Sequence, residues 1–535
     1  MPVGLVEIEL TKKSRLKRGI LIMLKLPRRR LMLAAISVSF FAVLPASAQT
    51  FNEDIKLIGD DTSGGDEFGD CVAISGNTII IGAPGNSQSR GAAYLFDRET
   101  GQQLFKLTAL DRAPYDSFGR AVAISGTTAI VGAPQDNARS GSVYMFDTET
   151  GLQIRKLYAA DGASSARFGS SLAISGTTAI IGAIRTLNPG GIYAGSVYLF
   201  DLETGLQTAQ FFPSNPETYL YFGSAVAISE TTAIIGAPSF QAGSGAVYIF
   251  DRETGLQTAL FTGTQGQGKY PGEALGESVV ISGTTAIVGT PRFYDSVSRK
   301  QSGTVYLYDT QTGLQTGQLF PSDQSDDISF GQSVMVSGTT VIVGASRHNG
   351  RIGATYLFDF ETGLQTAKLV SSDGAPIHQF GGSVTMSGST AIIGASFNDD
   401  RGDETGSVYI FDFAPKIQHQ PLGLIVSDGD TAEFSVTPAD ETGTDFLWRR
   451  NGIDLIDEEN ISGTQSSTLQ IVASEYDQAY YDCVITNRYG PTLTHPVVLG
   501  IMPDPNACEA DLNNDGVLNF FDVSQFIVDF SRGCP

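Results

Sequence analysis

Short apolar segments recur along residues 51–413, and Gly, Ser, Thr or Asp bounds each of them. The segment FGRAVAISGTTAIVGAP at 118–134 returns as FGSSLAISGTTAIIGAI at 168–184 and as FGSAVAISETTAIIGAP at 222–238. Each copy continues with a segment like GSVYLFD, and most then have one like TGLQTAKL. Runs rich in Val, Ile, Tyr and Phe are typical of strands, and nearly continuous apolar runs indicate sheets covered on both faces. Each copy therefore predicts four β-strands.

The copies follow one another at intervals of 50 to 55 residues, measured between the glycines of their opening pairs. These glycines are Gly69, Gly119, Gly169, Gly223, Gly276, Gly331 and Gly381. A unit of four short strands cannot bury both faces of its sheet alone. We therefore expect a mainly β protein with a seven-bladed β-propeller over residues 49–414, in which neighbouring blades cover each other. An open solenoid is the alternative.

The seventh copy ends at Asp412 without a fourth strand. The segment DIKLIGDD at 54–61 matches the fourth-strand segments LFKLTALD at 104–111 and TAKLVSSD at 366–373. We expect this early segment to complete the last blade, because that joins the two ends of the ring and removes an exposed sheet edge.

The motifs Phe118-Gly119 and Gly132-Ala133-Pro134 resemble the FG-GAP repeats of integrin α-chain heads and many bacterial surface proteins. The resemblance covers residues 51–413 and implies a propeller that binds ligands through the loops of one face. In that family, several blades carry an Asp-rich calcium loop between strands one and two. Here those turns are of the Ser-Gly-Thr-Thr type, which lacks the alternating oxygen ligands that calcium requires. We therefore expect no calcium in the blades.

The loops between strands two and three and between blades are expected on the ligand-binding face. The longest lie at 184–194, 215–221 and 290–301. Arg and aromatic side chains are frequent anchors of interfaces, although the alternative is that they pack on their own loops. The tripeptide Arg401-Gly402-Asp403 is either an integrin-binding tip or, as we expect, part of a polar loop. The candidate ligand-binding residues are Arg185, Tyr193, Tyr219, Tyr221, Arg292, Phe293, Tyr294 and Arg299.

The N-terminal region has the features of a secretory signal peptide, which we place at residues 1–48. Three arginines at 28–30 precede an apolar run at 31–44, and Ala46-Ser47-Ala48 supplies a small-residue cleavage site. The apolar run is short for a membrane-spanning helix, although an uncleaved anchor is the alternative. The start of translation is Met1 or Met23. We expect a secreted or cell-surface protein with no transmembrane segment after cleavage.

Residues 415–502 have a different pattern, with Trp448 in the segment FLWRRNG and Tyr481 two residues before Cys483. These positions resemble the core tryptophan and the tyrosine corner of the immunoglobulin fold. Val436 stands about where that family has its first cysteine, so we expect no inter-sheet disulfide and a core held by apolar packing. The resemblance implies a spacer or binding module of the β-sandwich type.

Residues 503–535 contain the segment DLNNDGVLNFFD, which has the spacing of an EF-hand calcium loop with its turn at Gly516. The following segment predicts an amphipathic helix, and the whole resembles one half of a dockerin. An acidic turn without metal is the alternative. Cys508 and Cys534 flank the segment, and in an exported protein we expect them to form a disulfide. The predicted calcium ligands are Asp511, Asn513, Asp515, the carbonyl of Val517, Asn519 and Asp522.

The overall composition argues against nucleic-acid binding, a zinc site and His-dependent catalysis. The chain of 535 residues has a net charge of −23, and such an acidic protein repels the phosphates of nucleic acids. It has only four histidines and four cysteines, which leaves little for a zinc site or for His-dependent catalysis.

We expect an exported, non-enzymatic adhesion or recognition protein whose propeller loops bind an extracellular protein or glycan. Its calcium module would attach it to a cohesin-like or cell-surface partner. One alternative is a component of an extracellular polysaccharide-degrading complex, docked through the C-terminal module. Another is a hydrolase with its site in the central channel, although no paired carboxylates or nucleophile–base set stands out from the repeat.

Overall fold

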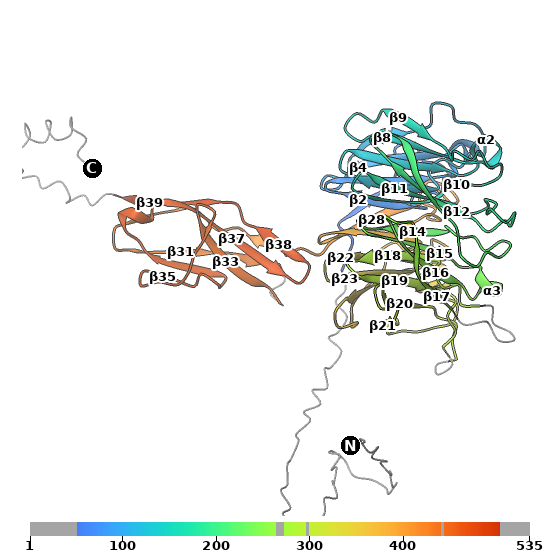
Figure 1. The fold of residues 1–535 in the computed structure, drawn as a ribbon. Helices are drawn as coiled ribbons and strands as arrows, with labels where there is room; N and C mark the ends of the chain where they lie inside the picture. Colours follow the sequence, from blue (N-terminus) through green and yellow to red (C-terminus); the bar gives the residue numbers. More distant parts are fainter. Residues whose placement is uncertain (1–50, 264–271, 296–298, 440–442, 503–535) are drawn as a thin grey trace, which may run out of the picture. The chain divides into compact units, whose positions relative to one another are not determined.

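The computed structural model describes residues 51–263, 272–295, 299–439 and 443–502, and it consists mainly of β-strands (Figure 1). The predicted signal peptide at 1–48 and the predicted calcium module at 503–535, with Cys508 and Cys534, lie outside the described residues.

Seven antiparallel four-stranded sheets form residues 55–412, and the predicted four strands of each copy are confirmed. We call these sheets blades one to seven. The first strands are β2 (Val72–Ser75), β6 (Ala121–Ser125), β10 (Phe168–Ser175), β14 (Ala225–Ile228), β18 (Ser278–Ser282), β22 (Ser333–Ser337) and β26 (Ser383–Ser387). The second strands are β3 (Thr78–Ala83), β7 (Thr128–Ala133), β11 (Thr178–Ala183), β15 (Thr232–Ala237), β19 (Thr285–Thr290), β23 (Thr340–Ala345) and β27 (Thr390–Ala395).

The outer half of each blade is equally regular. The third strands are β4 (Ala92–Asp97), β8 (Ser142–Asp147), β12 (Ser196–Asp201), β16 (Ala246–Asp251), β20 (Thr304–Asp309), β24 (Ala354–Asp359) and β28 (Ser407–Asp412). The fourth strands of blades one to six are β5 (Gln103–Leu107), β9 (Gln153–Leu157), β13 (Leu206–Phe211), β17 (Gln257–Thr262), β21 (Gln315–Leu319) and β25 (Gln365–Leu369).

Four of the loops between strands two and three contain a short turn that is assigned as helix. Three consecutive residues of each turn have positive φ, so these segments are tight turns rather than helical rods. They are α1 (Asn86–Ser89), α2 (Asp136–Arg139), α3 (Phe240–Gly243) and α4 (His348–Arg351).

The apolar cores lie between consecutive blades rather than inside any one of them. Successive residues of a strand point to opposite faces of its sheet, so Ile79 and Ile81 pack towards blade seven while Ile80 packs towards blade two. Each of the seven blade-to-blade boundaries has such a buried cluster, including the boundary of blade seven with blade one. This explains why strands two and three are nearly continuous apolar runs.

The strand β1 (Ile55–Leu57) closes the ring, as the sequence predicts. It pairs antiparallel with β28, with Ile55 opposite Ile410 and Leu57 opposite Val408. The first strands contact each other in turn around the molecule, and the last contact joins β26 to β2. Seven sheets joined in this way fit a β-propeller (Figure 1).

A glycine in each second strand faces the opening glycine of the next blade. A Cβ atom on Gly82 would lie 2.1 Å from the carbonyl oxygen of Gly119, and one on Gly394 would lie 2.1 Å from that of Gly69. All seven boundaries repeat this contact, with distances of 2.0 to 2.2 Å. Only a residue without a side chain lets the two backbones approach so closely.

Residues 417–502 form sheets of their own. One sheet has the order β30-β39-β37-β33-β34, with β38 paired to β37; a second has the order β31-β36-β35, and β29 pairs with β32. The elements are β29 (Ile417–His419), β30 (Leu424–Ser427), β31 (Thr431–Ser435), β32 (Thr437–Pro438), β33 (Asp445–Arg450), β34 (Ile453–Asp454), β35 (Ile461–Ser462), β36 (Thr468–Val472), η1 (Glu475–Asp477), β37 (Ala479–Asn487), β38 (Gly490–Leu493) and β39 (Val497–Met502).

The core of residues 417–502 contains the residues that the sequence singled out. Trp448 is fully buried and donates its indole N–H to the carbonyl of Ser466 at 2.9 Å. The Tyr481 hydroxyl donates to the carbonyl of Asp477 at 2.9 Å. Cys483 and Val436 lie in the same apolar cluster, and Cys483 is a free thiol, as expected.

The glycine contact generates a stability prediction. In Gly344→Ala the new methyl group would lie 2.0 Å from the carbonyl oxygen of Gly381. The backbones must separate, which should cost about 1–3 kcal/mol or more of the free energy of unfolding. Gly190→Ala is the control, because its Cβ would meet only the flexible Asn188 side chain at 3.3 Å. Denaturant unfolding of both variants measures the difference, and equal midpoints would contradict the role of the contact.

Candidate functional site

The connections between strands two and three and the linkers between blades gather at one end of the blades, which we call the loop face. Antiparallel strands in the order one to four place both kinds of connection at the same end. Backbone bonds join them, because the N–H of the residue before each opening glycine donates to a loop of the preceding blade. The seven N···O distances are 2.9 to 3.3 Å. For example, the Phe68 N–H donates to the carbonyl of Thr405 in blade seven, and the Phe380 N–H donates to that of Ile352 in blade six.

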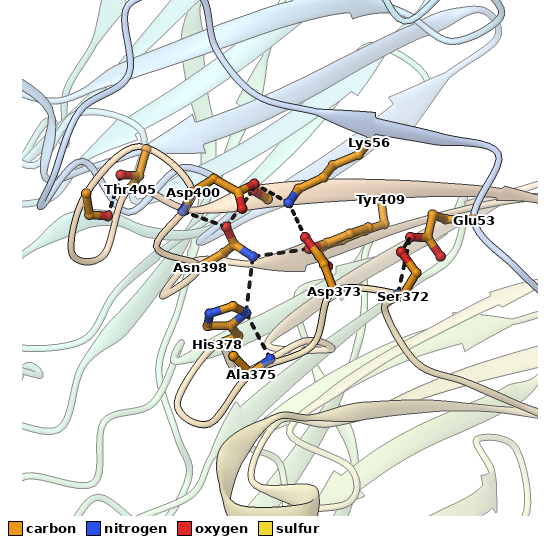
Figure 2. Close-up of polar contacts among 12 residues, drawn as sticks. Glu53, Lys56, Ser372, Asp373, Ala375, His378, Asn398, Asp400, Thr405 and Tyr409 are labelled. Atoms are coloured by element: carbon orange, nitrogen blue, oxygen red, sulfur yellow. Dashed lines mark hydrogen bonds and ion pairs between the residues drawn. The ribbon is translucent and has the colours of Figure 1, made fainter.

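A polar cluster recurs beside this face, and Figure 2 shows the example in blade seven. Asp373, in the linker before the blade, accepts a hydrogen bond from the Tyr409 hydroxyl at 2.7 Å and from Lys56 of β1. Lys56 also pairs with Asp400. Asn398 donates to His378 Nδ1 at 3.2 Å and to the Tyr409 oxygen at 3.2 Å. We call the linker carboxylate with its Tyr and Lys the latch.

The latch is a property of the repeat and not of one blade. In blade six, Asp323 accepts from Tyr356 at 2.7 Å and from Lys368 at 2.5 Å. Blades one and two use Asp61 with Tyr94 and Lys106, and Asp111 with Tyr144 and Lys156. In blade three the lysine is replaced by Gln210, which donates to Asp161. Because these side chains bond to one another, we interpret the latch as structural: in these five blades it ties the linker to the outer strands. In blade four Tyr248 donates to Asn215 instead of a carboxylate.

Burial and hydrogen bonding perturb the latch groups. The pKa of Asp323 lies well below its ordinary value, chiefly because of its hydrogen bond with His348; burial opposes this shift, and Lys368 and Tyr356 add to it. The pKa of Asp373 is also lowered, because the bonds from Lys56 and Tyr409 outweigh the effect of burial. A lowered carboxylate pKa stabilises the fold while the group is ionised.

The latch therefore predicts acid sensitivity. Asp323 should make its full contribution to the free energy of unfolding above the ordinary carboxylate pKa of about 4, and this contribution should fall as the pH drops below that value. The expected contribution is about 1 kcal/mol after solvent screening. Asp323→Asn should have a lower melting temperature than the wild type at pH 7. Between about pH 5 and pH 2, the melting temperature of the variant should decrease less than that of the wild type. Asp60→Asn, an exposed neighbour of the blade-one latch, is the control, and identical pH profiles of Asp323→Asn and wild type would contradict the assignment.

The structure brings four of the predicted ligand-binding residues together at blades three and four. The Arg185 guanidinium lies 6.0 Å from the centre of the Tyr221 ring, and the rings of Tyr219 and Tyr221 are 6.3 Å apart. The Tyr219 N–H donates to the carbonyl of Tyr193 at 2.8 Å. Tyr193 and Tyr219 are 45% and 55% exposed. Their rings are available to a ligand and do not form a core of their own.

The other predicted residues form a separate group at blade five. Phe293 is half-buried against Tyr306 and Phe320, with ring centres 6.1 and 5.9 Å away, so it packs on its own surroundings. Tyr294 is half-buried, whereas Arg292 and Arg299 are exposed. Arg292 lines a polar hollow of about 310 Å³ together with Glu277, Gln301, Asp327 and Arg347.

The tripeptide 401–403 takes part in ring closure. Arg401 donates to the carbonyl of Gly59 at 2.8 Å and to that of Asp60 at 3.2 Å, while the Asp403 carbonyl accepts from Gly65 at 2.8 Å. The exposed arginine is therefore hydrogen-bonded to the chain's own backbone, which favours the expected polar loop over an integrin-binding tip.

Sequence reasoning missed two arginines beside Arg185. They are Arg139 and Arg167. Arg167 is half-buried, and its backbone N–H donates to the carbonyl of Arg139 at 2.9 Å. The backbone N–H of Arg185 donates to the carbonyl of Ala166 at 3.1 Å. Arg167 stands next to the opening pair of blade three, outside the long loops. An alignment of the seven copies would have found Arg167, because no other copy has an arginine at this position. The residues there in the other copies are Glu67, Ser117, Tyr221, Ala274, Ser329 and Gln379.

The remaining titratable groups of the described residues provide no metal-ligand cluster. Cys71 is a free thiol whose Sγ donates to the Gly119 carbonyl at 3.0 Å, and burial raises its pKa. In the described ranges, no group of three or more His, Cys, Asp or Glu residues could hold a metal ion. None of the described helices has the length and hydropathy needed to span a membrane.

The comparisons with known proteins identify the family. The FG-GAP repeat profile matches residues 51–96, 102–146, 152–200, 206–250, 314–358 and 364–411. These matches cover just over half of the chain, so the protein belongs to the FG-GAP repeat family. The unmatched gap contains blade five, in which Leu275 replaces the phenylalanine of the opening pair. No curated protein matches the chain.

Several solved structures resemble a part of the chain. Titin domain M4 is 25% identical over 17% of this chain and 96% of its own, with a TM-score of 0.16. Titin M10, in its complex with obscurin-like 1, is 21% identical over 17% and 95%, also with a TM-score of 0.16. The tandem Ig repeats of Dlar are 15% identical over 30% and 65%, again at 0.16. TM-scores this low do not establish a shared fold.

Proposed function

We propose that the protein is an exported, non-enzymatic recognition or adhesion protein that binds an extracellular protein or glycan at its loop face. The observation that carries this proposal is the group of Arg185, Tyr193, Tyr219 and Tyr221 at blades three and four. Exposed tyrosines beside an arginine are the side chains that dominate binding interfaces. The carboxylates and tyrosines of the latches, by contrast, are used within the fold, which speaks for a scaffold rather than a catalytic site.

Export is supported by the N-terminal sequence. The arginines at 28–30, the apolar run at 31–44 and the Ala-Ser-Ala site at 46–48 are together typical of a signal peptide. We accordingly place the mature protein outside the cell, either secreted or at the cell surface.

The C-terminal modules suit an attachment role. We assign residues 415–502 to an immunoglobulin-like sandwich because Trp448 is buried in the core and the Tyr481 hydroxyl bonds to backbone four residues upstream. Residues 503–535 would bind calcium and connect the protein to a cohesin-like or cell-surface partner. Five side-chain oxygen donors and one carbonyl suit this hard cation.

The capture of ligands tests the function. The mature protein, residues 49–535, is applied to an array of extracellular glycans and matrix proteins. Tyr193→Ala/Tyr219→Ala should bind the captured ligand at least about tenfold more weakly, because two exposed rings are lost. Tyr115→Ala is the matched control, since Tyr115 is exposed at the position in blade two that Tyr219 occupies in blade four. Unchanged binding by the double variant, or no capture by the wild type, would contradict the proposal.

The calcium assignment has its own test. Titration calorimetry of the mature chain should show one weak calcium site, with a dissociation constant of about 10⁻⁴–10⁻³ M. Asp515→Ala should abolish the heat, because position 5 of the loop is a direct ligand. Asp403→Ala serves as a control for loss of an acidic side chain elsewhere. A calcium signal that survives in Asp515→Ala would place the site outside this loop.

A further inference from the structure

Two positions of each blade lie together on the loop face, and we call them the paired positions. One is two residues before the opening glycine, and the other is three residues after the second-strand glycine. The N–H of the second donates to the carbonyl just before the first in five blades, at 3.1 to 3.3 Å. The pairs in blades one to seven are Glu67 and Gly85, Ser117 and Gln135, Arg167 and Arg185, Tyr221 and Ser239, Ala274 and Arg292, Ser329 and Arg347, and Gln379 and Phe397.

In blades two, five and six, a polar or positive member of the pair interacts with a neighbouring side chain. In blade two the Gln135 amide donates to the Ser117 hydroxyl at 2.8 Å. In blade six Arg347 forms an ion pair with Asp327 at 3.0 Å. In blade five Arg292 lies near Glu277, and its charge opposes the rise in the pKa of that carboxyl that burial causes.

Blade three differs because both of its paired positions are arginines. Arg139 of blade two adjoins them, and within the described residues none of the three forms an ion pair. The Nε atoms of Arg167 and Arg185 are buried without a hydrogen-bond acceptor. Burial, followed by the charges of Arg185 and Arg139, lowers the pKa of Arg167.

This group of three positive charges lies in a chain whose net charge is −23. Asp and Glu number 57 against 34 Lys and Arg, yet among the described residues no carboxylate forms an ion pair with these three arginines. Clustered like charges destabilise a fold, and a buried guanidinium N–H without an acceptor adds a desolvation cost. An arriving anion would remove both penalties, and the planar guanidinium presents its donors in the geometry of a carboxylate or sulfate.

We propose that Arg167 and Arg185, flanked by Arg139 and Tyr221, form a subsite for the carboxylate or sulfate groups of an acidic polysaccharide. The neighbouring tyrosines favour a saccharide, because the exposed ring of Tyr219 and the Tyr221 ring beside Arg185 offer flat apolar faces on which a sugar ring stacks. An acidic peptide is the competing ligand. The inference rests on the proposed function and gives it a ligand class.

The experiment measures binding of the mature protein to polygalacturonate, dextran sulfate, neutral dextran and poly-glutamate by calorimetry at low and at physiological ionic strength. We expect binding to at least one of the two acidic polysaccharides and not to dextran, with affinity falling as salt rises. The first two probes separate a carboxylate from a sulfate site. Arg167→Gln/Arg185→Gln should weaken binding at least about tenfold, whereas Arg347→Gln, whose charge Asp327 already balances, should leave it unchanged.

A thermal melt separates binding from structural roles. Removing two repelling charges should leave the melting temperature of Arg167→Gln/Arg185→Gln equal to that of the wild type or higher. A lower melting temperature, equal binding by the double variant, or preference for poly-glutamate would each overturn this inference. If the wild type captures an extracellular ligand on the array but neither acidic polysaccharide binds, the proposed function stands and the anionic subsite fails. If it captures nothing and binds none of the four probes, both fail.

Discussion

The close approach of two glycine backbones at each blade boundary sets the geometry on which the rest of the molecule depends. A second-strand glycine leaves no space for a Cβ beside the opening glycine of the next blade. This approach lets alternate residues of strand two pack against different neighbours, so that the apolar cores lie between blades. Closure by β1 then gives blade seven the same environment as the others.

With the blades fixed in this way, the loop face is free to vary. In blades one, two, three, six and seven the linkers are held twice, by the backbone bonds of the opening pairs and by the latches. Neither device uses the side chains at the paired positions, so these can change from blade to blade without breaking the bonds that hold the linkers. Blade three uses this freedom to place Arg167 and Arg185 side by side, while blade two places a neutral, hydrogen-bonded pair there.

The repeat, the four strands of each copy and the closing strand could be predicted because they depend on periodic apolar patterns. Trp448 and Tyr481 likewise indicated a core that the structure confirms. The candidate site could be predicted in part: loop length selected Arg185, Tyr193, Tyr219 and Tyr221, which the structure brings together. It also selected Phe293, which packs against Tyr306 and Phe320. Loop length did not select Arg167, although an alignment of the seven copies distinguishes it. The contact of Arg139 with Arg167 joins neighbouring blades, and position along the chain does not reveal it.

Hydrogen exchange with and without the acidic polysaccharide that binds, polygalacturonate or dextran sulfate, tests most directly whether the loop face at blades three and four is the recognition surface. The account predicts that the ligand slows exchange of the amides at 139–141, 166–168, 185 and 219–222. Those at the corresponding positions of blade six, 328–330 and 347, should exchange as before. Slower exchange at blade six alone, or at no part of the loop face, would contradict the account.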